Sequence, residues 1–365
     1  MSHTPLFRAD HVGSLLRPPA LRQAFRDQSA GDRDVDFSAI QDEAIRGAIQ
    51  LQEDIGLESI TDGEFRRMSY WARFVDRVEG LTVAPATFRF RDAAGTEAEF
   101  LAPHVQAPVR RTTSIAGDEF EFVRAHTVRT PKLTLPSPAT MHFWRGQEGI
   151  EPGAYADRDA YFADLAAVYR EEIADLAERG CRYLQIDDVP LAMLAAAPVQ
   201  DQLRAAGEDP EVLIDRYVRL TNAAVAGRPA EMTVAMHLCR GNFKGRWLSE
   251  GGYEPVAERL FNQVDMDTFF LEYDTPRAGD FRPLRFVPKT KSVVLGLVST
   301  KTPVLEDQGA LRRRIDDAAL FLPLEQLGVS PQCGFASTVG GNSLSIDDER
   351  RKLGLVVDLA RAVWN

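Results

Sequence analysis

Short apolar runs alternate with longer amphipathic stretches along almost the whole chain. The short runs end at polar or glycine-containing turns and are typical of buried strands, which we expect to begin near residues 9, 57, 132, 183, 233, 268, 292 and 327. The longer stretches carry apolar residues at helical spacing and predict helices near residues 19–27, 37–56, 158–179, 210–226, 254–262, 305–322 and 347–364. Eight strands that alternate with helical stretches match the strand count of a closed parallel barrel. The pattern therefore predicts an α/β fold of the (β/α)8 TIM-barrel class.

One segment, about residues 81–128, departs from this repeat. Residues 81–83, 88–90 and 105–114 alternate apolar and polar positions, and Asp92-Ala93-Ala94-Gly95 separates two of these runs as a turn. This pattern predicts an inserted antiparallel hairpin within one domain that spans residues 1–365. A doubly wound sheet is the competing architecture, but no Gly-x-Gly-x-x-Gly follows the first strand and no Walker A loop occurs in the sequence.

Composition narrows the class of protein. The 365 residues are 44% hydrophobic and 27% charged, as in ordinary globular proteins, and the net charge of -11 argues against a nucleic-acid partner. The first residues lack the apolar core of a secretory signal, and no apolar run is long enough for a membrane span, so we expect a cytoplasmic protein without a membrane partner. The three cysteines argue against a disulfide framework and remain available as metal ligands. A homo-oligomer is compatible with this composition.

The most informative stretch is Met236-His237-Leu238-Cys239, at the end of a predicted strand. Side chains two residues apart on a strand point to the same face, so an imidazole and a thiolate would lie side by side there. Glu272 and Cys333 stand at the ends of two later strands, where barrel active sites collect. The resulting N, S, O, S donor set suits zinc. Because three anionic ligands leave the site negative, we expect it to favour alkyl transfer to a thiol rather than hydrolysis.

Other strand ends carry candidate substrate-binding residues. Of the neighbours Asp187 and Asp188, only one can face the site, and Asp187 is preferred because it has the parity of Gln185. A carboxylate at Asp187 or at Glu64 suits the ammonium group of an amino acid, although Glu64 could instead form a salt bridge with a neighbouring arginine. The glycine turn before Ser14 could receive a substrate carboxylate through backbone N–H groups. Trp144 offers an aromatic face to a ring or packs in the core.

These stretches together resemble the catalytic domain of the cobalamin-independent methionine synthase family, and in particular its short, single-barrel branch. The likeness runs nearly end to end and is carried by Asp10-His11-Val12-Gly13-Ser14, Thr61-Asp62-Gly63-Glu64-Phe65-Arg66-Arg67, Leu184-Gln185-Ile186-Asp187-Asp188, His237-Leu238-Cys239-Arg240-Gly241-Asn242, Phe270-Leu271-Glu272-Tyr273-Asp274 and Ser330-Pro331-Gln332-Cys333-Gly334-Phe335.

The resemblance implies a zinc-dependent methyltransferase that moves a methyl group to the thiol of homocysteine or a related small thiol. Its implied zinc ligands are His237, Cys239, Glu272 and Cys333, and its implied substrate residues are Val12, Ser14, Glu64, Asp187 and Trp144. The chain departs from the family in two ways. It lacks the second barrel that helps to bind polyglutamylated folate, and Lys301 stands where the family has a proton-donating histidine. The methyl donor is therefore left open between methyl-folate and another methyl carrier.

Two other functions compete with this interpretation. Zinc-dependent alkyl transfer to another thiol, as in the epoxyalkane–coenzyme M transferases, would use the same barrel and metal chemistry. Coenzyme M carries a sulfonate and no ammonium group, so Glu64 and Asp187 argue against it. A non-catalytic barrel stabilised by zinc is the second alternative, because four protein ligands can also close a structural site.

Overall fold

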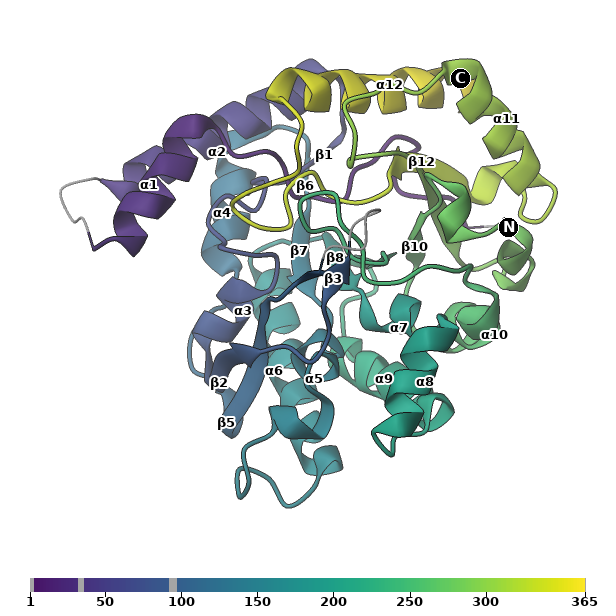
Figure 1. The fold of residues 1–365 in the computed structure, drawn as a ribbon. Helices are drawn as coiled ribbons and strands as arrows, with labels where there is room; N and C mark the ends of the chain where they lie inside the picture. Colours follow the sequence, from purple (N-terminus) through teal and green to yellow (C-terminus); the bar gives the residue numbers. More distant parts are fainter. Residues whose placement is uncertain (1–2, 32–35, 92–96, 365) are drawn as a thin grey trace.

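A parallel sheet of six strands forms the centre of the molecule. A computed structural model describes residues 3–31, 36–91 and 97–364. The six strands lie side by side in sequence order, and every neighbouring pair is parallel. Figure 1 shows this sheet surrounded by helices; its strands are β7 (Leu133–Pro136), β8 (Tyr183–Asp188), β9 (Thr233–Leu238), β10 (Thr268–Glu272), β11 (Ser292–Val298) and β12 (Leu327–Pro331).

Shorter strand segments extend both edges of this sheet. At one edge, Ala9 forms a parallel bridge with Val329 of β12. At the other, β1 (Ser59–Ile60) pairs in parallel with β6 (Thr130–Pro131), which directly precedes β7. Strand-like pairing is thus present at all eight predicted positions, and the parallel α/β architecture is confirmed. Within the described part of the chain, no ladder joins the Ala9 segment to β1, so the closed hydrogen-bonded ring stays a prediction.

Helices follow the strands and cover the outside of the sheet. Four of them begin at an aspartate whose side chain accepts a backbone N–H of the first turn, which fixes each helix start; these caps are Asp36, Asp157, Asp209 and Asp307. The predicted helices are present as α1 (Pro19–Ser29), α2 (Phe37–Asp54), α6 (Arg158–Glu178), α9 (Pro210–Val225), α10 (Glu254–Gln263), α11 (Gln308–Ala319) and α12 (Ile346–Trp364). Figure 1 shows that α1 and one end of α2 project beyond the body. None of the described helices is long and apolar enough to span a membrane.

The inserted segment is an antiparallel hairpin followed by a helix. Its long strands are β2 (Val78–Pro85) and β5 (Leu101–Arg111), and a shorter antiparallel pair consists of β3 (Phe90–Arg91) and β4 (Glu97–Ala98). The predicted turn at residues 92–95 lies outside the described residues. The end of the segment corrects the prediction, because Gly117–His126 forms helix α4. Phe120 and Val123 bury the helical i, i+3 face there, a spacing that strand alternation does not explain.

A small hydrophobic cluster and a buried ion pair fill the interior of the sheet beneath the strand ends. Tyr183, Ala235, Phe270 and Val294 come from four successive strands and form one buried cluster. Beside them, Lys132 is fully buried and its Nζ lies 3.1 Å from Oδ1 of Asp10. Such a filled interior leaves the carboxyl ends of the strands as the place for a ligand cavity.

Candidate active site

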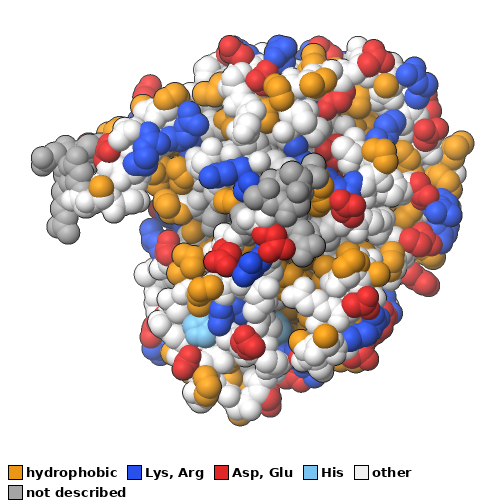
Figure 2. Space-filling view, in the orientation of Figure 1, with side chains coloured by type: hydrophobic (Ala, Val, Ile, Leu, Met, Phe, Trp, Pro, Cys, Tyr) orange, Lys and Arg blue, Asp and Glu red, His pale blue; other side chains and the backbone are white. Residues whose placement is uncertain are grey.

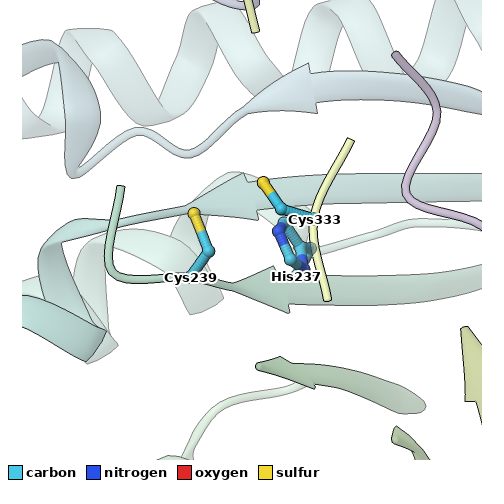
Figure 3. Close-up of side chains that lie close together, drawn as sticks. All are labelled: His237, Cys239 and Cys333. Atoms are coloured by element: carbon cyan, nitrogen blue, oxygen red, sulfur yellow. The ribbon is translucent and has the colours of Figure 1, made fainter. Parts of the chain in front are cut away.

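Three of the four predicted metal ligands lie together. His237 is the last residue but one of β9, Cys239 directly follows that strand, and Cys333 follows β12. Their candidate ligand atoms all lie within 4.8 Å of one another, and all three residues are buried (Figure 3). The parity of His237 and Cys239 on one strand, together with the proximity of the strand ends, explains why residues so far apart in sequence meet here.

The donor chemistry of this group fits a soft divalent metal such as zinc. Both ring nitrogens of His237 are buried, and neither has a hydrogen-bond partner among the described residues. Contact with the Cys239 thiol lowers the pKa of the Cys333 thiol, and the same contact raises the pKa of Cys239. The pair therefore gives up its first proton readily and resists losing the second. A bound cation would remove that resistance, because metal binding favours deprotonated thiols.

Glu272, the fourth predicted ligand, lies outside this group of three. One carboxylate oxygen is 2.5 Å from Arg277 Nη2 and 3.4 Å from Lys301 Nζ, and the other accepts the backbone N–H of Arg240. Burial alone would raise the pKa of Glu272, but Lys301, Arg240 and Arg277 outweigh it and lower that pKa to about 2. Glu272 is thus an ionised carboxylate beside the site, and Lys301 is its ion-pair partner.

A cavity of about 550 Å³ opens above the three candidate ligands. All five predicted substrate residues contribute to its wall: Val12, Ser14, Glu64, Trp144 and Asp187. The three clustered ligands contribute as well, so the candidate metal site and the candidate substrate site are one space. Glu272 and Lys301 are not among the described residues that line this cavity.

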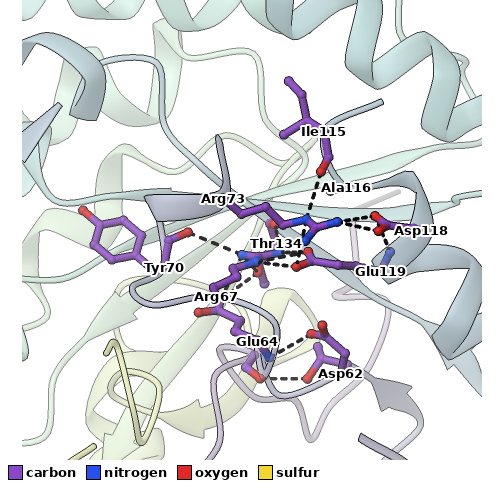
Figure 4. A network of polar contacts seen from close by, with 12 residues as sticks. Asp62, Glu64, Arg67, Tyr70, Arg73, Ile115, Ala116, Asp118, Glu119 and Thr134 are labelled. Atoms are coloured by element: carbon purple, nitrogen blue, oxygen red, sulfur yellow. Dashed lines mark hydrogen bonds and ion pairs between the residues drawn. The ribbon is translucent and has the colours of Figure 1, made fainter. Parts of the chain in front are cut away.

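Glu64 is held in an unusual conformation by a buried polar network (Figure 4). Its backbone φ is +60°, in the left-handed region that a non-glycine side chain rarely adopts and that often marks functional sites. Its Oε1 accepts a 2.7 Å hydrogen bond from Thr134 and lies 3.5 Å from Nη1 of Arg67, which also pairs with Glu119 at 2.7 Å. The Oε2 atom is buried and has no partner within the described part of the chain. The alternative given for Glu64, a salt bridge with a neighbouring arginine, is therefore present and buried, and it leaves one oxygen of Glu64 available.

Asp187 is connected to the first strand segment through Gln185. The amide of Gln185 donates to Oδ1 of Asp187 at 2.7 Å and to the carbonyl of Val12 at 2.6 Å. Burial raises the pKa of Asp187 to about 7, and the nearby Glu64 adds to the effect. The ionised form of a carboxylate whose pKa is raised by burial is strongly stabilised by a cationic partner. Asp188 instead accepts the backbone N–H of Leu191 at 2.7 Å, the structural bond expected for the second aspartate.

Two glycines allow the Ser14 segment to pack closely against its neighbours, Gly13 against Thr134 and Gly334 against Ser14 itself. Gly13 has a φ of +124°, and a β-carbon there would lie 2.7 Å from a Thr134 methyl group. A β-carbon at Gly334 would lie only 1.9 Å from Oγ of Ser14. Any side chain at Gly334 would therefore push Ser14 away from the residues that follow β12.

The aromatic part of the wall was missed in the sequence, except for Trp144. Tyr70 and Trp71 follow β1, Phe100 precedes β5, and Phe243 follows β9; all four line the cavity. The ring centroids of Phe100 and Trp144 are 5.3 Å apart in an edge-on arrangement. Nothing in local periodicity distinguishes these aromatics from core residues. The inserted hairpin was recognised, but its contact with the cavity was not.

Comparison with known proteins assigns the chain to a family. The family model described as "Cobalamin-independent synthase, Catalytic domain" matches residues 12–361. A Bacillus subtilis protein of uncharacterised function, YxjH, is 39% identical over 98% of this chain and 95% of its own length. Methionine synthase of Saccharolobus solfataricus is 25% identical over 92% of this chain and 90% of its own length.

A solved structure agrees with this result over the full length. It is a Listeria monocytogenes protein provisionally assigned as a vitamin-B12-independent methionine synthase, with 33% identity, full coverage of both chains and a TM-score of 0.78. The resemblance predicted from short motifs is thereby confirmed. The chain belongs to the cobalamin-independent synthase catalytic-domain family and is a methyltransferase of the methionine synthase type.

Proposed function

We propose that this protein transfers a methyl group to the thiol of homocysteine, at a zinc ion held by His237, Cys239 and Cys333, with Glu272 as a further ligand. The observation that carries the proposal is the shared cavity, because the three clustered donors and the carboxylates Glu64 and Asp187 line the same space. We also propose that residues 1–365 form one domain with a closed barrel, as the strand order favours.

The protein groups fit the parts of an amino-acid thiol. Glu64 and Asp187 bind and orient the substrate ammonium group, and burial excludes water that would compete for it. The turn at Val12 and Ser14 receives the substrate carboxylate. When bound, zinc lowers the pKa of the substrate thiol so that a thiolate forms near neutral pH. Glu64 and Asp187 favour homocysteine over coenzyme M, whose sulfonate would meet two carboxylates. The proton donor predicted at Lys301 is not assigned, because that lysine contacts Glu272 and is not among the lining residues.

Zinc K-edge X-ray absorption on the purified protein, with and without homocysteine, tests this function. We expect zinc in the resting protein and one additional sulfur scatterer at about 2.3 Å when homocysteine is added. Homoserine, which has a hydroxyl in place of the thiol, is the matched control and should leave the zinc shell unchanged. A protein without zinc, or a shell that ignores homocysteine, would refute the proposal; the second result would favour a structural zinc site.

A further inference from the structure

The described wall of the cavity is acidic and lacks free cations. Glu64, Asp187 and Asp188 are buried carboxylates that line it, and no lysine or arginine is among its described lining residues. Of the cations close by, Arg67 is engaged with Glu119, and Arg89 forms ion pairs on the hairpin. Charged side chains of both signs intermingle on the face shown in Figure 2. The excess of negative charge is therefore a feature of the cavity wall and not of that whole face. These carboxylates would repel an anionic ligand.

Aromatic rings form much of the remaining wall. Tyr70, Trp71, Phe100, Trp144 and Phe243 all line the cavity. Aromatic faces attract cations, and quaternary ammonium groups in particular are recognised by cages of such rings. Trp144 is 3% exposed, so this attraction would act with little screening by water. The carboxylates favour a cation of any kind, and the aromatic rings favour a cation whose charge lies beneath methyl groups.

Lys301, the residue considered as a proton donor, does not line the described cavity wall. The family position for a proton donor holds Lys301, whose Nζ lies 3.4 Å from Glu272, outside the described cavity wall. An amine that leaves a folate carries away an electron pair and needs a proton. A sulfonium or a quaternary ammonium donor leaves as a neutral molecule and needs none. The negative charge of the cavity wall and the position of Lys301 outside it both favour a donor that leaves as a neutral molecule.

We propose that the methyl donor is a cationic methyl-onium compound, a methylsulfonium or a quaternary methylammonium; this inference rests on the function proposed above. In the transfer, a bond forms between the thiolate sulfur and the methyl carbon. The bond from that carbon to the onium sulfur or nitrogen breaks, and its electron pair stays on the departing atom. The products are a thioether and a neutral leaving group, and the proton of the starting thiol passes to solvent.

A binding experiment tests the cavity without any turnover. Calorimetry on the zinc-loaded protein would compare trimethylsulfonium and tetramethylammonium with tert-butanol, a neutral molecule of similar shape, and with methanesulfonate. We expect binding of the two cations only. Leu101, on the cavity wall, provides a matched pair of variants. Leu101→Lys should weaken cation binding at least roughly fivefold relative to Leu101→Gln, since each adds polarity but only one adds positive charge. Equal affinities in the two variants, or no cation binding to the parent protein, would overturn the proposal.

A turnover experiment separates this inference from the proposed function. Homocysteine would be incubated with one donor at a time, trimethylsulfonium, S-methylmethionine, tetramethylammonium or 5-methyltetrahydrofolate, each carrying deuterated methyl groups. Labelled methionine would then be measured by mass spectrometry. Methionine from an onium donor and not from the folate is the expected result, and it also distinguishes sulfonium from ammonium. Methionine from the folate alone would overturn the donor assignment and leave the homocysteine function standing. If homocysteine never enters the zinc shell, the proposed function fails, and the calorimetry still decides whether the cavity selects cations.

Discussion

Replacing Arg67 by methionine should destabilise the protein strongly, because Arg67 is the centre of the network that holds Glu64. Its guanidinium is 3% exposed and Glu119 is fully buried, with 2.7 Å between Nη2 and Oε2. Removing one partner of a buried ion pair typically costs 3–5 kcal/mol of stability, since the other charge stays buried. Arg73 Nε lies 3.3 Å from Oε1 of Glu119 and would still compensate in part. We therefore expect a loss of about 3 kcal/mol.

Urea unfolding of three further variants makes this expectation refutable. Arg350→Met removes an arginine from an exposed pair with Asp54, and we expect it to lower the unfolding free energy by at most about 1 kcal/mol. Replacing both Arg67 and Glu119 by methionine should be less harmful than the sum of the two single changes, because neither charge is then left buried alone. A loss below 1 kcal/mol for Arg67→Met, or strictly additive effects, would show that the network contributes little. If the network also orients Glu64, Arg67→Met should weaken homocysteine binding.

Three other outcomes follow from the site and its surroundings. Cys239→Ser should lose zinc on dialysis, as measured by elemental mass spectrometry, whereas Cys181→Ser should retain it because Cys181 precedes β8 at the opposite end of the sheet. Asp187→Asn should weaken homocysteine binding roughly tenfold to a hundredfold by calorimetry, the usual contribution of a charge-assisted hydrogen bond; unchanged binding would contradict the role given to this carboxylate. Burial raises the pKa of Glu349 to about 8, above its unfolded value of about 4.3, so its stabilising contribution is lost as pH rises between those values. Glu349→Gln should therefore match the parent protein in thermal unfolding near pH 4.5 and exceed it by about 2–5 kcal/mol at pH 8.5, and equal stability at both pH values would refute this.

The repeat of strands and helices was predictable because burial and periodicity are local signals. Asp157, for example, caps α6 where the amphipathic pattern begins, and β8 and β9 begin at the predicted residues. Short helices were missed, among them α7 (Pro190–Met193) and α8 (Ala197–Ala205). Residues 190–194 are buried throughout, so they show no polar face by which periodicity could reveal a helix.

The site was predictable to the extent that strand parity determines it. His237 and Cys239 were expected to share a face, and they lie together with Cys333. The alternation of side chains along a strand predicts the face on which a side chain lies, but it does not predict the conformation of a long side chain. Glu272 ends β10 as expected, yet its carboxylate contacts Arg277 and Lys301, because two cations near a buried carboxylate offer a large electrostatic gain. Arg277 lies in a short 3-10 helix after the strand, where no sequence pattern predicted a partner.

The aromatic residues of the cavity wall, apart from Trp144, were not predictable from the sequence, because they come from segments that meet only in the folded protein. Phe100 and Leu101 come from the inserted hairpin, whereas Trp144 follows β7, so their meeting depends on how the hairpin packs. Backbone contacts fix that packing: Thr87 donates its N–H to the carbonyl of Trp144 at 2.9 Å, and Ala86 donates to the carbonyl of Phe100 at 3.0 Å. The first bond joins the hairpin to the segment that follows β7, and the second lies within the hairpin itself. Because an inserted segment supplies part of the wall, the charge and aromatic character of the cavity can change without any change to His237, Cys239 or Cys333.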